Sequence, residues 1–174
     1  MFFWGLTVTL GYALSDVIAA AMPVARAETS IVLTWVVLMA IPVALTVRKV
    51  RKGTGLLEVN PVWAGLTVLG LLGNVAGIAF GLAYSTRSFG YFEKWFLFGA
   101  AGFAYTAWKM DGFSRYVYTA AAAGNVVFAV LLFSDPSLVG AAFLGGVVLQ
   151  GMPMMVDWFY YSHCGEVLRS DLLP

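Results

Sequence analysis

Six long apolar runs, separated by short polar or turn-forming breaks, account for most of the chain. They lie near residues 2–24, 30–47, 61–84, 93–109, 116–133 and 137–161. A helix needs about 20 apolar residues to cross the hydrocarbon of a bilayer, and most of these runs approach that length. None has the alternation of a barrel strand, and a chain in lipid must satisfy its own backbone hydrogen bonds. The pattern therefore predicts an all-α polytopic transmembrane bundle of about six helices.

Composition extends this prediction to the whole chain. Of the 174 residues, 61% are hydrophobic and 11% are charged, and the mean hydropathy is +0.86, whereas soluble domains carry about 25% charged residues. We therefore expect a single integral membrane domain over residues 1–174, with no soluble domain and with the lipid bilayer as its main partner. The net charge of +1 creates no field that would attract nucleic acid, so we expect no nucleic-acid partner.

The basic residues predict how the bundle is oriented. Seven of the ten Lys and Arg residues fall on one side of the six predicted spans: Arg48, Lys49, Arg51, Lys52, Lys109, Arg115 and Arg169. Because cytoplasmic loops carry the excess of such residues, both termini should be cytoplasmic. We expect a multi-pass protein, in the plasma membrane if the source is prokaryotic. Aromatic belts at the membrane interface would explain four tryptophans near predicted span ends: Trp63, Trp95, Trp108 and Trp158.

Five of the six runs carry a polar side chain at a similar depth. At 1.5 Å of rise per residue, these side chains lie roughly 14–21 Å from the predicted cytoplasmic ends of their helices. They are Asp16, Thr34, Asn74, Asn125 and Gln150. We interpret them, together with Tyr12, as the substrate-binding side chains of a polar cavity near the midplane. The alternative for the three amides is that they only form hydrogen bonds between helices.

Asp16 is an ionisable group inside the first apolar run. Placing such a group in hydrocarbon costs about 2.5–3.5 kcal/mol, so Asp16 should face the bundle interior and have a partner or water there. No Lys or Arg lies near the centre of any predicted span to neutralise it. In that position the carboxyl group could carry protons or balance the charge of a cationic solute.

The chain contains no established catalytic or metal-binding motif. Asp16 and Asp157 are the candidate catalytic residues, because a carboxylic acid in an apolar pocket can act as a general acid without a metal. Asp157 is close to the predicted cytoplasmic end, where it should reach water or the basic loop. His163 and Cys164 follow a Met-rich segment, but the spacing fits no metal motif. We therefore predict neither a metal site nor a cofactor.

Four short segments carry a resemblance to a known family. They are Trp4-Gly5, Tyr12-Ala13-Leu14-Ser15-Asp16-Val17, Arg48-Lys49 and Ala83-Tyr84-Ser85. Together with the glycine-rich third run, they make residues 4–90 resemble one half of a drug/metabolite transporter of the EamA type. The resemblance implies two inverted five-helix repeats that move metabolites by alternating access. It also implies a homo-oligomer, for which Gly73, Gly77 and Gly81 form the candidate contact face.

Three functions are compatible with these patterns. We favour a small-solute carrier, proton-coupled through Asp16, over an enzyme. The second is a membrane-embedded enzyme that isomerises or cyclises a lipid or isoprenoid by carboxylic-acid catalysis. The third is an accessory subunit of a larger membrane complex, bound through the glycine face of the third run. A polar cavity near the midplane would favour the carrier.

Overall fold

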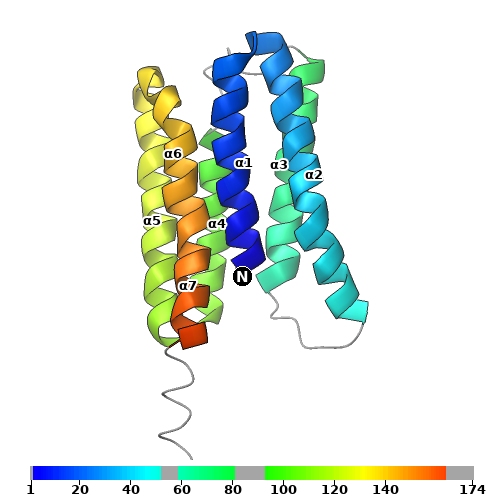
Figure 1. The fold of residues 1–174 in the computed structure, drawn as a ribbon. Coiled ribbons are helices and arrows are strands. Elements are labelled where there is room, and N and C mark those ends of the chain that lie inside the picture. The colour runs from blue at the N-terminus through cyan, green and yellow to red at the C-terminus, as the bar shows by residue number, and fades with distance from the viewer. Residues whose placement is uncertain (1, 52–58, 81–92, 164–174) are drawn as a thin grey trace, which may run out of the picture.

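The computed structural model describes residues 2–51, 59–80 and 93–163, which form an all-helical bundle (Figure 1). Its first five helices are α1 (Phe2–Ala21), α2 (Val24–Arg51), α3 (Val59–Ala79), α4 (Glu93–Lys109) and α5 (Gly112–Ser134). After the 3-10 turn η1 come the three parts of the last helix: α6 (Ala142–Gly146), the π turn η2 (Val147–Gly151) and α7 (Met152–His163). With these three parts counted as one, the prediction of about six helices is confirmed.

Four of these helices are long and apolar enough to cross a membrane. Their candidate spans are Phe3–Ala21, Arg26–Leu45, Gly112–Ser134 and Ala142–His163. In α3 the apolar stretch is shorter and covers Val62–Gly77, and α4 has 17 residues. Apolar side chains cover much of the outer surface of the bundle, as lipid contact requires. The chain is therefore an integral multi-pass membrane protein.

Two helix starts differ from the prediction. The second helix begins at Val24 rather than near residue 30, because the Pro23 carbonyl accepts a hydrogen bond from the Arg26 N–H at 2.9 Å and starts the first turn. The sixth run opens with η1 (Pro136–Ala141), and its α-helix starts only at Ala142. Residues 81–84 of the predicted third run lie outside the described residues.

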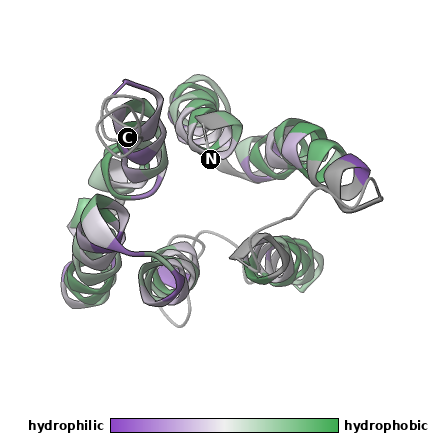
Figure 2. Cartoon of the chain, turned by 90° about the horizontal axis from the view of Figure 1, so that it is seen from below, coloured by the Kyte–Doolittle hydropathy of each residue, from purple (hydrophilic) through white to green (hydrophobic). Residues whose placement is uncertain are grey.

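The helices surround the centre of the bundle in a ring (Figure 2). Contacts follow the order α1, α2, α3, α4, α5 and the last helix, which closes the ring by packing on α1. The most extensive of these interfaces joins α4 to α5. Successive helices run in opposite directions, so α1 begins and α7 ends at the same end of the bundle (Figure 1).

Glycines allow α1 and the last helix to approach closely. A Cβ atom on Gly5 would lie 2.8 Å from the Gly151 carbonyl oxygen, so the two backbones come close together there. One turn earlier in the last helix, a Cβ atom on Gly146 would overlap the Tyr12 ring. These glycines therefore fix the position of Tyr12 against the last helix.

We predict that Gly146→Ala destabilises the protein. The added methyl group would displace the Tyr12 ring from a closely packed site, which typically costs about 1–3 kcal/mol. Gly65→Ala in α3 is the matched control, because no atom lies within 4 Å of its added Cβ. Thermal unfolding in detergent should show a lower Tm for the first variant and an unchanged or slightly higher Tm for the second. Equal Tm values would contradict this packing.

Candidate functional site

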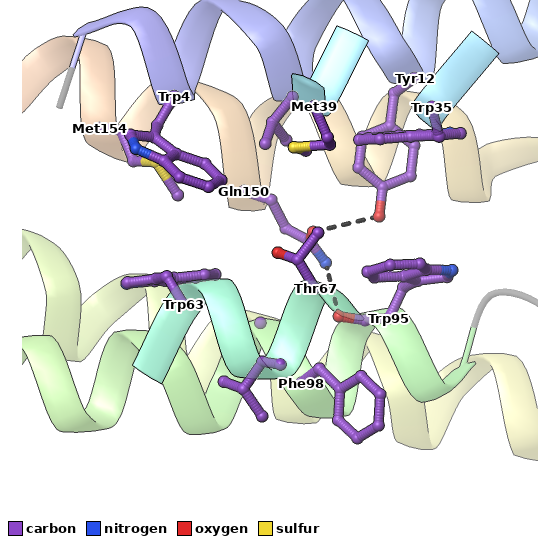
Figure 3. Close-up of a pocket in the computed structure, with 13 residues that line it drawn as sticks. Trp4, Tyr12, Trp35, Met39, Trp63, Thr67, Trp95, Phe98, Gln150 and Met154 are labelled. Carbon is purple, nitrogen blue, oxygen red and sulfur yellow. Dashed lines mark hydrogen bonds between the residues drawn. The ribbon is translucent and has the colours of Figure 1, made fainter. Parts of the chain in front are cut away.

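The side chain of Gln150 joins four parts of the bundle. Its Nε2 donates to the Trp95 carbonyl oxygen at 3.0 Å and to Asn125 Oδ1 at 2.9 Å. Its Oε1 accepts a hydrogen bond from the Tyr12 hydroxyl at 3.1 Å. Figure 3 shows the bonds to Tyr12 and Trp95. Through one buried amide, the last helix is therefore bonded to α1, α4 and α5.

The irregular backbone of the last helix explains how Asn125 enters this network. Pro153 has no N–H with which to bond the Leu149 carbonyl four residues earlier, and the backbone widens here into the π turn η2. Asn125 Nδ2 donates to the Leu149 carbonyl oxygen at 3.0 Å and to the Ala121 carbonyl oxygen at 2.8 Å. The amide thus satisfies a carbonyl that the proline leaves without its usual donor, and its Oδ1 remains available to Gln150. π turns occur frequently at functional sites.

Beside Gln150 lies a cavity of about 30 Å³ with six aromatic side chains among the residues of its wall (Figure 3). Five helices contribute to it: α1, α2, α3, α4 and the last helix. Its aromatic lining residues are Trp4, Tyr12, Trp35, Trp63, Trp95 and Phe98. Thr67 and Gln150 add polar groups, and the lining contains no Asp, Glu, Lys, Arg or His. A space of this size can hold water, and the surrounding rings offer contacts to a small apolar or cationic group.

A pair of stacked indoles lies at one end of the cavity. The rings of Trp35 and Trp95 are 6.1 Å apart with planes at 14°. The Trp35 Nε1–H donates to Ser15 Oγ at 3.1 Å, and the Trp35 ring meets the edge of Tyr12 at 5.1 Å. Gly70 lies directly against Trp95, where an added Cβ would be 2.5 Å from the ring. The stack is therefore held in place by its neighbours.

Trp63 is fixed in a similar way on the opposite wall. Its Nε1–H donates to Thr106 Oγ1 at 3.0 Å, and its ring packs edge-on against Phe103 with 4.9 Å between centroids. Gly102 leaves room for the indole, since an added Cβ would lie 2.8 Å from it. The indole of Trp63 is thus held in place by a hydrogen bond and by close packing.

The structure brings three of the six predicted substrate-binding residues together. Tyr12 and Gln150 line the cavity, and Asn125 supports Gln150 from behind. Asn74 is only 1% exposed, but it does not line the cavity and neither atom of its amide group has a hydrogen-bond partner. Thr34 is half-buried and donates to the Ser30 carbonyl oxygen of its own helix at 2.8 Å.

The expectation that Asp16 faces the bundle interior is wrong. Its side chain is exposed on the outer face of α1 and does not line the cavity. Asp16 lies five residues before the end of α1 at Ala21, which is about 8 Å along the axis. At that depth the carboxyl group can reach interfacial water, and the desolvation argument for an inward position no longer applies. Its role as a substrate ligand or catalytic acid stays a prediction.

Four tryptophans of the cavity were missing from the predicted site. We assigned Trp63 and Trp95 to aromatic belts because of their position near span ends, but their rings line the cavity. Trp4 was noted only for the family resemblance. Trp35 lies five residues inside its predicted run, deeper than the other three tryptophans, and this was the one available signal. Trp108, which is 70% exposed, fits the belt prediction.

Asp157 is buried, contrary to the expectation that it would reach water. Only 6% of it is exposed, and its two carboxylate oxygens accept hydrogen bonds from the hydroxyls of Ser114 and Tyr118, the latter at 2.8 Å. These bonds join α7 to α5. Asp157 does not line the aromatic cavity. Within residues 2–51, 59–80 and 93–163, no three His, Cys, Asp or Glu side chains are grouped to hold a metal ion, and Cys164 lies outside these ranges.

We predict that two buried asparagines respond oppositely to the same substitution. Asn125→Leu removes the donor to the Leu149 carbonyl and the acceptor of Gln150, and leaving buried polar groups unpaired costs about 1–3 kcal/mol. Asn74→Leu removes an amide that has no partner, so stability should be unchanged or higher. Thermal unfolding in detergent gives both values. Equal losses would contradict the specific role of Asn125.

A second pair of substitutions compares the two candidate acids. Asp157→Ala leaves the fully buried Tyr118 hydroxyl without its acceptor, so we expect a loss of about 1–3 kcal/mol. Asp16→Ala changes an exposed side chain and should stay within about 0.5 kcal/mol of the parent protein. Chemical unfolding in mixed micelles measures both. A larger loss for Asp16→Ala would show that its carboxyl group has a structural partner.

No family model matches this chain, and it has no significant similarity to curated proteins or to solved structures. The resemblance of residues 4–90 to half of an EamA-type transporter therefore stays a prediction, and the functional argument depends on the geometry of the cavity.

Proposed function

We propose that this protein is a membrane carrier that binds a small solute in the aromatic cavity beside Gln150. The observation that supports this most directly is the position of the cavity among five helices of the ring. Carriers commonly bind their solutes near the membrane midplane, between helices that can move relative to one another. The proposal includes six membrane crossings, with α3 and α4 among them.

The depth of Gln150 supports this proposal. Gln150 is eight residues from the start of α6 at Ala142 and thirteen from the end of α7 at His163. These separations correspond to roughly 12 Å and 20 Å along the helix axis. Gln150 is therefore well inside the last helix, at a distance from both of its ends.

Alternating access would use the Trp35–Trp95 stack as one of its barriers. Trp95 is the third residue of α4, so the stack lies between the cavity and the end of the bundle where α4 begins. In this proposal, separation of the two rings opens the cavity toward that end. Gln150 would take part, because it bonds the Trp95 carbonyl directly.

Orientation and assembly complete the proposal. Arg48, Lys109 and Arg115 belong to the end of the bundle where α1 begins, which we place in the cytoplasm by the positive-inside rule. A homo-oligomer through the predicted glycine face remains part of the proposal. Gly73 of that face is exposed and Gly77 half-buried, whereas Gly81 lies outside the described residues. Proton coupling through Asp16 is not included, since Asp16 is exposed and does not line the cavity.

Uptake into proteoliposomes tests the carrier directly. Vesicles containing the full chain should accumulate at least one of three radiolabelled probes, choline, phenylalanine or glucose, saturably and above empty vesicles. Thr67→Val keeps the shape of a cavity residue but removes its hydroxyl, so uptake at low solute should fall about fivefold, as expected for a lost hydrogen bond of about 1 kcal/mol. Thr119→Val, an exposed position on α5, is the matched control.

Two results would contradict the carrier proposal. Absence of uptake for all three probes, with folded protein in the vesicles, would remove the transport function. Uptake that Thr67→Val leaves unchanged would place the solute outside this cavity. Asp16→Asn should transport like the parent chain, and a loss of uptake in that variant would return Asp16 to the mechanism.

A further inference from the structure

The amide of Gln150 presents an acceptor rather than a donor to the cavity. Both N–H groups of Gln150 are used, one by the Trp95 carbonyl and one by Asn125. The Tyr12 hydroxyl donates its proton to Gln150 Oε1. What remains toward the cavity is the second lone pair of Gln150 Oε1 and the Thr67 hydroxyl, which can both donate and accept. Such a site favours a solute that brings donors or positive charge.

The cavity wall has the same electrostatic preference. The faces of aromatic rings are electron-rich, and indole is the side chain that attracts cations best. Four indoles line this one cavity: Trp4, Trp35, Trp63 and Trp95. No Lys, Arg or His among the lining residues would repel a positive charge. An anionic solute, in contrast, would meet the electron-rich ring faces and the acceptor oxygen of Gln150.

We propose that the solute is a small organic cation, a substituted ammonium ion whose charged head lies among the indole faces. This inference rests on the proposed function and specifies the substrate class of the same cavity. The ammonium group is stabilised by cation–π contacts, which strengthen when water is excluded. A hydroxyl or N–H group elsewhere on the solute donates to the free lone pair of Gln150 Oε1.

The placement of the rings accounts for how such a cation is held without a carboxylate. Trp35, Trp63 and Trp95 are fixed by hydrogen bonds or stacking, so their rings are already in place around the cavity. Alkylation of the nitrogen spreads the charge and weakens its hydration, which lowers the cost of leaving water. The site should therefore prefer alkylated ammonium ions over ammonium itself.

Choline and its neutral isostere 3,3-dimethylbutan-1-ol are suitable probes, because they share a shape and a hydroxyl but differ in charge. Binding to the purified full chain can be followed by intrinsic tryptophan fluorescence and by calorimetry. Choline should bind saturably, and the neutral isostere about five- to thirtyfold more weakly, as a cation–π contribution of about 1–2 kcal/mol implies. Ammonium chloride at the same concentration should not compete.

Two substitutions of Trp4, a residue of the cavity wall, test whether its aromatic ring causes the preference for the cation. Trp4→Phe should weaken choline binding severalfold and Trp4→Leu further, while binding of the neutral isostere changes little. In the described part of the bundle, Trp4 donates no hydrogen bond to another helix. These variants therefore remove no hydrogen bond between helices, and we expect them to fold. Trp108→Leu, on the exposed face of α4, is the matched control and should bind choline normally.

The outcomes separate this inference from the carrier proposal. Equal binding of choline and the neutral isostere, no choline binding to folded protein, or no dependence on the ring at position 4 would each overturn the cation assignment. Uptake of phenylalanine or glucose but not choline would overturn it while leaving the carrier intact. Saturable, ring-dependent choline binding without uptake of any probe would support the cation site and contradict transport.

Discussion

The hydrogen bonds of Gln150 are the interaction on which the centre of this bundle depends. A primary amide in a nonpolar interior must find partners for its donors and acceptor, and leaving them unmade is costly. Gln150 finds three, on α1, α4 and α5. The position of the Gln150 side chain depends on Pro153 and on the π turn before it. The Leu149 carbonyl, which Pro153 leaves without its usual donor, accepts a hydrogen bond from Asn125, and Asn125 in turn bonds Gln150. One backbone irregularity thereby fixes how four helices meet.

This central network leaves the neighbouring space to aromatic rings. Because Gln150 is satisfied by protein groups, the cavity needs no charged residue to support it, and its walls can be built from indoles. Glycines beneath Trp35 and Trp95 let those rings lie flat against the helices. Separate bonds from Ser15 and Thr106 set the orientation of two indoles. The side chains of the cavity wall are held in place, and we expect movement only where the Trp35–Trp95 stack can separate.

The helices could be predicted from the sequence, but the directions of most side chains could not. Apolar run length identified six helices, and equal depth along them brought Asn125 and Gln150 together correctly. The rotation of each helix was not readable, because in a membrane both the lipid-facing and the inward-facing sides are apolar. We therefore expected Asp16 to face inward because of the free-energy cost of placing a carboxylate in lipid, although Asp16 lies near a helix end. For the same reason Trp63 and Trp95 were taken as belt residues, since depth alone does not distinguish a belt from a cavity wall.

Indole N–H resonances of the six tryptophans test the central claim most directly. Four of these rings line the cavity, whereas Trp108 and Trp158 do not. Titration of ¹⁵N-labelled protein in micelles with choline should shift the signals of Trp4, Trp35, Trp63 and Trp95 along one saturation curve and leave the other two in place. Shifts confined to Trp108 and Trp158, or a linear drift of all six signals without saturation, would contradict a solute site at the centre of the ring.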